Sequence, residues 1–423
     1  MSVKEVALAA KKASVACGKA SLGVRNGALH AMAQALREHA ADIVQANELD
    51  MQAAREAGTA EPLLDRLQLT SDRIEGMACG LESLAELPDP LGQVQQERTL
   101  ASGVNLTRVS VSMGVVAMVY EARPNVTADA AGICVKTGNA CVLRGGSMAF
   151  NSNVYLAHLL HDAAVSAGMP VNCICAVETK DRAATDELLQ MRGIVDVLIP
   201  RGGAGLIQHC VQNATVPVIE TGVGNCHVYV HEPANVEMAR DIVVNAKTQR
   251  PGVCNAIESL LVDDSIAEQV LPVILPELAQ RGVVIHADEH AYAIAQQLIE
   301  QGVSMQLVPA TEDDWATEYL NLDIAVRCMS GLDAAIEHVN RFGTRHSECI
   351  VTEDEAAAEE FLASIDAAAV YWNASTRFTD GGEFGLGAEI GISTQKLHAR
   401  GPFALAALTT YKYLLRGSGQ VRS

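Results

Sequence analysis

The chain has 423 residues, 49% of them hydrophobic and 19% charged, which excludes a disordered protein and favours two or three globular domains. Its net charge is −20 and its pI is about 5.0, so we expect neither nucleic acid nor an anionic membrane as a partner. The eleven cysteines follow no disulfide or zinc spacing, and the first residues carry no signal-peptide pattern. We therefore expect a cytoplasmic protein with reduced thiols.

Residues 1–88 are predicted to be helical, because alanines alternate there with charged residues at helical spacing. Two prolines and a glycine in LPDPLG (87–92) end this region. The stretch 105–112 then alternates polar and apolar residues, which predicts an exposed strand.

Four buried strands are predicted next, each followed by a helical segment or a glycine-rich turn. They are the apolar runs 114–122, 140–146, 173–179 and 195–203. This alternation is typical of a doubly wound parallel sheet. The loops after the strands are where such a sheet binds a nucleotide.

A second α/β region is predicted over residues 222–380. Short apolar strands alternate there with helices expected at 233–247, 265–281 and 289–302. Residues 381–423 begin glycine-rich and polar, and they end in an apolar stretch that predicts a last strand. We expect domains at 1–221 and 222–380, with 381–423 returning to the first domain.

Cys254 is the candidate nucleophile. It follows a Pro-Gly turn in QRPGVCNA (249–256), and loops on a rigid scaffold are frequent places for catalytic residues. A buried structural cysteine is the alternative interpretation, and we prefer it for the other ten. Cys226 has strand-like neighbours, which also indicates burial.

A carboxylate and an amide lie on two other predicted loops. Glu220 precedes Thr-Gly-Val-Gly and is either a general base or a carboxylate bonded to turn amides. Asn125 ends YEARPN and is either an oxyanion donor or the cap of the next helix. A thiol, a carboxylate and an amide on three separate loops can form a site that carries an acyl group as a thioester.

Two glycine-rich turns are candidate phosphate-binding loops, and an ordinary strand-to-helix turn is the alternative for each. The first, residues 144–147, offers a guanidinium, backbone amides and a hydroxyl. The second, residues 201–205, opens a helix but does not match GxGxxG. His338 and His346 lack a third ligand at suitable spacing, so we expect no metal site.

Several strings, spread over nearly the whole chain, resemble the γ-glutamyl phosphate reductase family of the aldehyde dehydrogenase superfamily. They are YEARPNVT, TGNACVLRGGS, PVIETGVGNCHVYV, QRPGVCNA, AIEHVNRFGTRHSECI and FGLGAEIGISTQKLHARGP. The resemblance implies an aldehyde dehydrogenase-like α/β fold with two doubly wound domains, one for NADP and one for catalysis. It also implies a small β element for oligomerisation, which would include residues 105–112 and the last strand.

The resemblance implies roles for individual residues. Cys254 matches the catalytic cysteine, and Asn125 matches the asparagine that forms the oxyanion hole with the Cys254 backbone N–H. Glu220 aligns with the general base of hydrolytic members, but the residues around it depart from their pattern. Cofactor contacts are expected from Arg144, Gly145, Gly146, Ser147, Gly202, Gly203 and Glu318. Substrate contacts are expected from Arg123, Arg250, His346 and Ser347.

The implied activity is NADPH-dependent reduction of L-glutamyl 5-phosphate to L-glutamate 5-semialdehyde and phosphate, in proline biosynthesis. Cys254 would carry the acyl group as a thioester, and Glu220 would be a positional residue or proton shuttle rather than a hydrolytic base. A homo-oligomer, either a dimer or a dimer of dimers, and a complex with glutamate 5-kinase are further expectations. The alternatives are a phosphate-independent NAD(P)-dependent semialdehyde dehydrogenase and a catalytically silent scaffold for the kinase.

Overall fold

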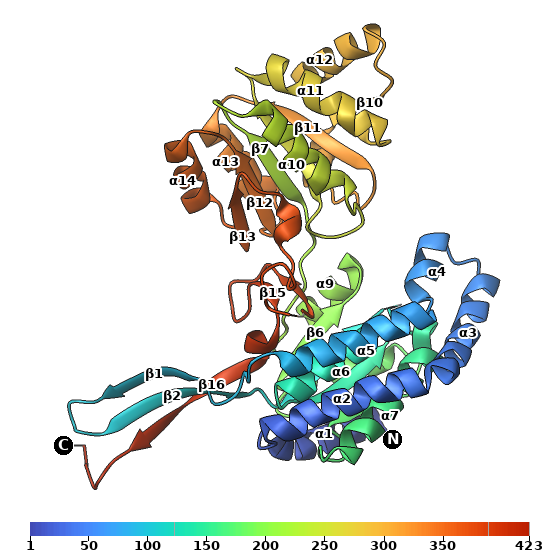
Figure 1. The fold of residues 1–423 in the computed structure, drawn as a ribbon, viewed down its shortest axis with the longest axis vertical. Helices are drawn as coiled ribbons and strands as arrows, with labels where there is room; N and C mark the ends of the chain where they lie inside the picture. Colours follow the sequence, from blue (N-terminus) through green and yellow to red (C-terminus); the bar gives the residue numbers. More distant parts are fainter. Residues whose placement is uncertain (122, 388, 423) are drawn as a thin grey trace. The chain divides into compact units, whose positions relative to one another are not determined.

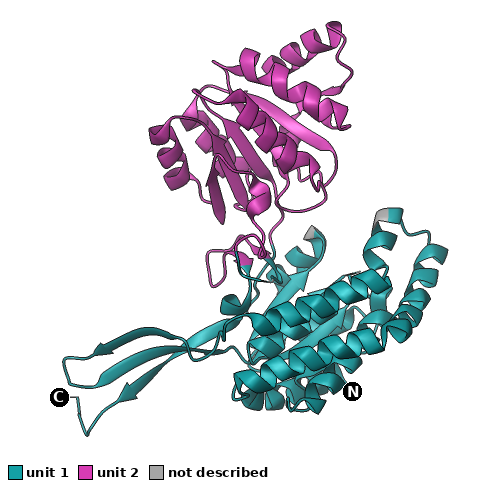
Figure 2. Ribbon diagram, viewed as in Figure 1, with its two compact units in different colours: residues 1–221, 385–391, 403–423 teal, residues 222–384, 392–402 magenta. Residues whose placement is uncertain are grey.

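The computed structural model describes residues 1–121, 123–387 and 389–422, with side chains for all of them except Pro62 and Ala204 (Figure 1). The chain forms two compact units, shown in Figure 2. Unit 1 comprises Met1–Thr221, Gly385–Gly391 and Phe403–Ser423, and unit 2 comprises Gly222–Phe384 and Ile392–Pro402. No helix in the described ranges is long and apolar enough to span a bilayer.

Unit 1 begins with the helices that the alanine-rich pattern predicts. They are α1 (Val3–Cys17), α2 (Leu22–Glu38), α3 (Ala40–Glu56), α4 (Glu61–Leu67) and α5 (Ser71–Glu86). Helix α1 starts at a capping box, in which Ser2 and Glu5 satisfy each other's backbone N–H groups. The helical prediction for residues 1–88 is therefore confirmed.

Four parallel strands form the main sheet of unit 1, in the order β5-β4-β3-β6. The strands are β3 (Val115–Tyr120), β4 (Ala140–Gly145), β5 (Ile174–Ala176) and β6 (Val197–Arg201). They alternate with α6 (Asn125–Lys136), α7 (Phe150–Ser166), α8 (Ala183–Leu189) and α9 (Ala204–Asn213). The strand order reverses between β3 and β6, and open α/β sheets bind ligands outside the carboxyl ends at such a point.

A separate antiparallel sheet of unit 1 has the order β1-β2-β16. Strand β2 (Asn105–Ser112) pairs with β1 (Val94–Thr99) on one side and along its whole length with β16 (Thr409–Arg416) on the other. The strands predicted at 105–112 and at the end of the chain are present, but the first is not exposed as predicted: of its eight residues only Asn105 is exposed. Strand β1 was not predicted, because all six of its residues are exposed and its sequence is polar.

Unit 2 is built on a sheet of seven parallel strands in the order β10-β9-β11-β8-β7-β12-β13. The strands are β7 (Cys226–Val230), β8 (Ile257–Asp263), β9 (Val284–Ala287), β10 (Gln306–Pro309), β11 (Asp323–Met329), β12 (Ser347–Val351) and β13 (Ala369–Trp372). The helices are α10 (Val236–Thr248), α11 (Ala267–Gln280), α12 (Glu289–Glu300), α13 (Leu332–Phe342) and α14 (Glu355–Ser364). Two short strands, β14 (Gly391–Ser393) and β15 (Gly401–Phe403), form a small further sheet. The predicted fold class of two doubly wound α/β regions with a small β element is confirmed.

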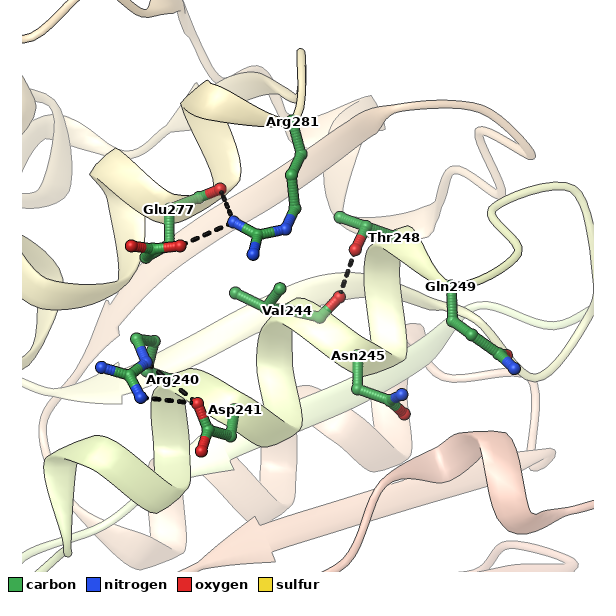
Figure 3. Close-up of a pocket in the computed structure, with 8 residues that line it drawn as sticks. All are labelled: Arg240, Asp241, Val244, Asn245, Thr248, Gln249, Glu277 and Arg281. Carbon is green, nitrogen blue, oxygen red and sulfur yellow. Dashed lines mark hydrogen bonds and ion pairs between the residues drawn. The ribbon is translucent and has the colours of Figure 1, made fainter.

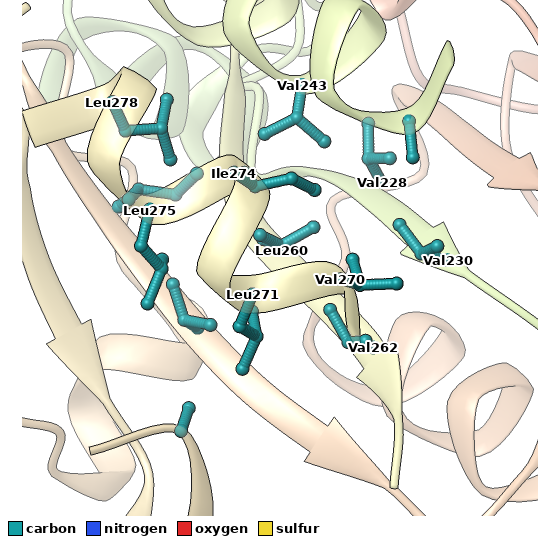
Figure 4. Close-up of a cluster of buried hydrophobic side chains, with 14 of the residues drawn as sticks. Val228, Val230, Val243, Leu260, Val262, Val270, Leu271, Ile274, Leu275 and Leu278 are labelled. Carbon is teal, nitrogen blue, oxygen red and sulfur yellow. The ribbon is translucent and has the colours of Figure 1, made fainter. Parts of the chain in front are cut away.

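A large cluster of buried aliphatic side chains fixes β7 and β8 against the helices of unit 2. Figure 4 shows Val228 and Val230 on β7, Leu260 and Val262 on β8, Val243 on α10, and Val270, Leu271, Ile274, Leu275 and Leu278 on α11. Burying one such side chain contributes about 1.5–3 kcal/mol. The cluster therefore makes β8 a rigid support for the loop that precedes it.

Candidate active site

Cys254 lies on the loop between α10 and β8, at the amino end of β8. All eleven cysteines are free thiols; eight are buried, Cys79 is exposed, and Cys254 and Cys328 are intermediate. Since β8 is buried along its whole length, the loop holds a partly accessible thiol at the end of a rigid strand. This is the setting that the sequence predicts for a nucleophile.

Hydrogen bonds on both sides of the thiol fix the path of its loop. The buried Asn255 side chain donates to the Thr379 carbonyl at 2.8 Å, and the Thr376 hydroxyl donates to the Asn255 carbonyl at 2.7 Å. The Lys247 ammonium donates to the Ile257 carbonyl at 3.0 Å. The loop is thus tied to α10, to β8 and to residues 376–379.

The main chain of Cys254 itself is held by residues 224–226. A Cβ at Gly224 would lie 1.5 Å from the Cys254 carbonyl oxygen, so only glycine fits there. The Cys226 thiol donates to the same oxygen at 3.1 Å, and the Gly224 N–H donates to Glu318 Oε1 at 2.6 Å. Glu318, which the sequence assigned to the cofactor, therefore braces the segment that contacts the nucleophile.

Arg377 supplies positive charge near the thiol, and Arg250 lies near Arg377. Burial lowers the pKa of Arg377, as does the neighbouring Arg250, whereas Asp380 and Cys254 raise it. The Arg377 Nε donates to Gln249 Oε1 at 2.7 Å, which anchors the guanidinium to the start of the loop. Positive charge favours the thiolate form of a cysteine. Arg250 was predicted from its neighbouring position, but Arg377 was missed because it is far from Cys254 in sequence.

His346 and Ser347 are completely buried, which is a correction to their predicted role as substrate contacts. The His346 Nδ1 and the Ser347 hydroxyl are 2.8 Å apart, and that hydroxyl is 2.6 Å from the Thr379 hydroxyl. Burial lowers the pKa of His346 to about 3, so the ring is neutral. Side chains with no exposed surface cannot reach a substrate in this conformation, and these two instead pack beneath the loop.

The candidate groups of unit 1 gather at the carboxyl edge of its sheet. Strand β3 pairs with both β4 and β6, so the loops after these three strands are neighbours. The exposed Asn125 is the first residue of α6, and its Nδ2 donates to Asp129 Oδ2 at 3.1 Å. Pro124 occupies the N-cap position of α6 and Asn125 is already helical, so the interpretation of Asn125 as the cap is wrong. Burial raises the pKa of Asp129 to about 6, and Arg123, two residues before Asn125, is exposed.

Glu220 lies beside the carboxyl end of β6. Its neighbours are bonded to that strand: the Ile219 N–H donates to the Leu198 carbonyl at 2.9 Å, and the Thr221 hydroxyl donates to the Pro200 carbonyl at 3.1 Å. The Glu220 residue is half-buried. Asn125 and Glu220 thus belong to unit 1, while Cys254 belongs to unit 2.

The two glycine-rich turns, residues 144–147 and 201–205, are the candidate phosphate-binding loops, and both lie at this carboxyl edge of the unit 1 sheet. The Arg144 guanidinium donates to the Gly145 and Asp181 carbonyls, but its buried Nε has no partner among the described residues. The Gly203 N–H donates to Glu121 Oε2 at 2.9 Å. Cβ atoms at Gly145 and Gly202 would lie 2.0 Å and 2.7 Å from their nearest neighbours, so the backbone there is closely packed. Gly146 and the exposed Ser147 complete the first turn.

A surface pocket of about 370 Å³ lies elsewhere in unit 2, between α10 and α11 (Figure 3). Its charged groups are already paired: Arg240 with Asp241, and Arg281 with Glu277. Cys254 does not line it. We therefore place the chemistry at the thiol loop rather than in this pocket.

Comparison with known proteins gives the family. The model of the aldehyde dehydrogenase family matches residues 1–293. The γ-glutamyl phosphate reductase of Moorella thermoacetica is 56% identical over 402 residues, which cover 94% of this chain and 93% of that protein. The crystal structure of the γ-glutamyl phosphate reductase of Thermotoga maritima is 44% identical, with a TM-score of 0.96 over 100% of both chains.

A more distant structure shows the same fold. An engineered glycolyl-CoA reductase with bound NADP+ is 16% identical, with a TM-score of 0.69, and covers 98% of this chain and 96% of its own. The resemblance that the sequence motifs indicated is confirmed by the closer matches. The chain belongs to the aldehyde dehydrogenase family and, within it, groups with the γ-glutamyl phosphate reductases.

Proposed function

We propose that this protein reduces L-glutamyl 5-phosphate to L-glutamate 5-semialdehyde and phosphate with NADPH, the second step of proline biosynthesis from glutamate. The full-length identity to γ-glutamyl phosphate reductases supports this reaction. The observation that carries the chemistry is the Cys254 loop, whose partly exposed thiol is held from behind by Gly224 and Cys226 and lies near Arg377.

Cys254 would act as the nucleophile. Its thiolate attacks the acyl carbon of the substrate; the C–S bond forms, and the C–O bond to phosphate breaks as phosphate leaves with the electron pair. Bound NADPH supplies the hydride that reduces the thioester carbon. The C–S bond then breaks as the aldehyde carbonyl forms, and the electron pair returns to the Cys254 sulfur.

Asn125 and the Cys254 backbone N–H would hold the oxyanion that forms in each half of the reaction. The Asn125 amide has two N–H donors and gives one of them to Asp129, so the other remains for the oxyanion. Loss of one oxyanion donor typically lowers the rate about 100- to 1,000-fold.

The family uses a nicotinamide cofactor, and we propose that NADPH binds at the carboxyl edge of the unit 1 sheet. Arg144 fits a phosphate or ribose oxygen there, because its buried Nε still lacks a partner in the described chain. The exposed Ser147 hydroxyl and the turns at Gly145–Gly146 and Gly202–Gly203 would complete the contact.

Glu220 would hold the reacting groups in position or transfer a proton, and it would not activate a water molecule. In this reaction phosphate is the leaving group, so a base that activated water would only hydrolyse the thioester. We expect Glu220→Gln to keep phosphate-dependent turnover within about tenfold of wild type, against the 100-fold or larger loss typical of a general base. Complete loss of turnover in a folded Glu220→Gln protein would contradict this.

The proposed substrate is an anion and the net charge of the chain is −20, so binding it requires positively charged side chains close to the thiol. We propose Arg377 and Arg250 as contacts for the anionic groups of the substrate, because Arg377 lies near the thiol and Arg250 lies near Arg377. Arg123, exposed beside Asn125 on unit 1, is a further candidate. A cytoplasmic location fits this assignment, since reactive thiols persist in a reducing compartment.

Oligomerisation would use the β1-β2-β16 sheet. Tyr411, Tyr413 and Leu415 on β16 are 48–59% exposed, and exposed apolar side chains on a sheet mark an interaction surface. We propose a homo-oligomer, a dimer or a dimer of dimers, that covers them. A complex with glutamate 5-kinase would shelter the acyl phosphate from water during transfer, and co-sedimentation of the two enzymes tests it.

Phosphate dependence tests the proposed function. The assay follows NADP+ reduction by glutamate semialdehyde, with and without phosphate, in wild type and Cys254→Ala. We expect turnover only in the wild type with phosphate. Turnover without phosphate would favour a hydrolytic semialdehyde dehydrogenase, and no turnover under any condition would favour a silent scaffold. Turnover that survives in Cys254→Ala would remove the thiol from the mechanism.

A further inference from the structure

Three side chains of types that commonly bind metals lie close together at the carboxyl end of β8, the end opposite the Cys254 loop. The ligand atoms of Asp264, His290 and Cys328 all lie within 4.8 Å of one another. His290 Nδ1 and Asp264 Oδ1 are 3.0 Å apart. In a tetrahedral zinc site, neighbouring ligand atoms are about 3.3–3.6 Å apart, given metal–ligand distances of about 2.0–2.3 Å. Side-chain movements of roughly 1 Å would therefore complete a site.

Backbone hydrogen bonds hold the three ligands in place. The Asp264 N–H donates to the Met329 carbonyl at 2.8 Å, which links the end of β8 to the strand that carries Cys328. The Cys328 N–H donates to Asp288 Oδ2 at 2.9 Å, and Asp288 caps the helix on which His290 lies. Each ligand comes from a different element, yet all three elements are tied together at this point.

The surroundings of the trio favour a cation. The carboxylates of Asp264 and Asp288 lie close to Cys328 and make the potential around its thiol negative. The same negative field attracts a dication, and coordination would expel the thiol proton. Cys328 and His290 are partly buried, and Asp264 is open to solvent. A metal could therefore enter from the solvent side.

We propose that Asp264, His290 and Cys328 bind one Zn²⁺ ion per chain, with water in the fourth position. A thiolate, an imidazole and a carboxylate form a donor set that suits zinc, and metals such as Mg²⁺ and Ca²⁺ prefer oxygen ligands alone. The seven residues of β8 separate this site from the Cys254 loop, about 20 Å at the usual rise of a strand. The ion would thus link β8, β11 and α12 at the edge of unit 2 opposite the thiol loop.

Zinc titration of the full-length protein tests the proposal. The titration uses the Cys254→Ser background, so that the nucleophile does not compete for metal, and calorimetry gives the stoichiometry and Kd. We expect one site with a Kd of 10 μM or tighter, and at least a 100-fold loss on Cys328→Ala or His290→Ala. The positioning variant Asp288→Asn should lose about tenfold. The matched control Cys79→Ser removes an exposed thiol elsewhere and should change nothing.

Cobalt gives an independent readout of the thiolate ligand. Co²⁺ bound at this site should show thiolate-to-metal charge-transfer absorption, which Cys328→Ser abolishes and Cys79→Ser keeps. Thermal unfolding in the absence of metal shows whether each variant is folded. An equal affinity for Zn²⁺ in the Cys328, His290 and control variants would overturn the proposal, as would a Kd weaker than about 100 μM in the parent protein.

Discussion

Gly224→Ala should disable the enzyme without unfolding it. The new Cβ would lie 1.5 Å from the Cys254 carbonyl oxygen, 2.3 Å from its carbonyl carbon and 2.6 Å from its Cα. Real Cβ contacts are not shorter than 3.0 Å, so one of the two segments must move by about 1.5 Å. A displacement of 1 Å in a reacting group can lower the rate about 100-fold. We therefore expect kcat/KM to fall at least 100-fold, equivalent to about 2.7 kcal/mol of lost transition-state stabilisation.

The assay is phosphate-dependent NADP+ reduction, with circular dichroism and thermal unfolding as checks of the fold. The steric conflict should also cost about 1–3 kcal/mol of unfolding free energy. Gly80→Ala is the matched control, because a Cβ there meets nothing within 4 Å and the residue lies in α5. It should retain full activity. If Gly224→Ala keeps its kcat/KM within threefold of wild type, the close contact between Gly224 and the Cys254 backbone does not position the thiol.

Three further predictions concern the interior of unit 2. Burial lowers the pKa of His346 from 6.5 to about 3, so the stabilising contribution of this residue is present above pH 6.5 and is lost as the pH falls toward 3. The difference in unfolding free energy between wild type and His346→Gln, measured by urea unfolding, should therefore narrow by about 1 kcal/mol from pH 7 to pH 5.5. Lys247 and Glu258 form a fully buried ion pair at 2.5 Å, so Lys247→Met should lower the unfolding free energy by about 3–5 kcal/mol at pH 8. The double variant Lys247→Met/Glu258→Leu should recover most of that loss, and equal destabilisation of the single and double variants would refute this. Arg377→Met should slow iodoacetamide labelling of the catalytic thiol at pH 7 about tenfold, and an unchanged rate would remove Arg377 from its activation.

Much of the fold follows from the sequence, because burial leaves a strong pattern there. Strand β3 is buried on both faces, so its sequence is apolar throughout, whereas β2 mixes polar and apolar residues because five of its eight residues are exposed or only partly buried. Strand β1 left no such pattern, since its exposed side chains are free to be polar. Strand β10 (QLVP) was missed because it is only four residues long and three of them are exposed.

The candidate site was harder to predict, because its supports are distant in sequence. Cys254 was found from its turn, but its contacts with Gly224 and Arg377 depend on how the chain folds back. His346 and Ser347 are polar residues in a family motif and were therefore placed against the substrate. The structure instead buries both under the loop, where His346 Nδ1 bonds to Ser347 and Ser347 to Thr379, while the buried His346 Nε2 has no partner among the described residues.

The central claim is that Cys254 carries the glutamyl group as a thioester, which hydride releases in the reductive direction and phosphate releases in the reverse direction, and which water does not release. The most direct measurement mixes the enzyme with glutamate semialdehyde and NADP+ in the absence of phosphate, quenches in acid and maps the acyl group by peptide mass spectrometry. The account predicts one glutamyl group on the peptide that contains Cys254, formed with a single-turnover burst of NADPH and removed when phosphate is added before the quench. An acyl group on another residue, or steady NADPH formation without phosphate, would contradict it.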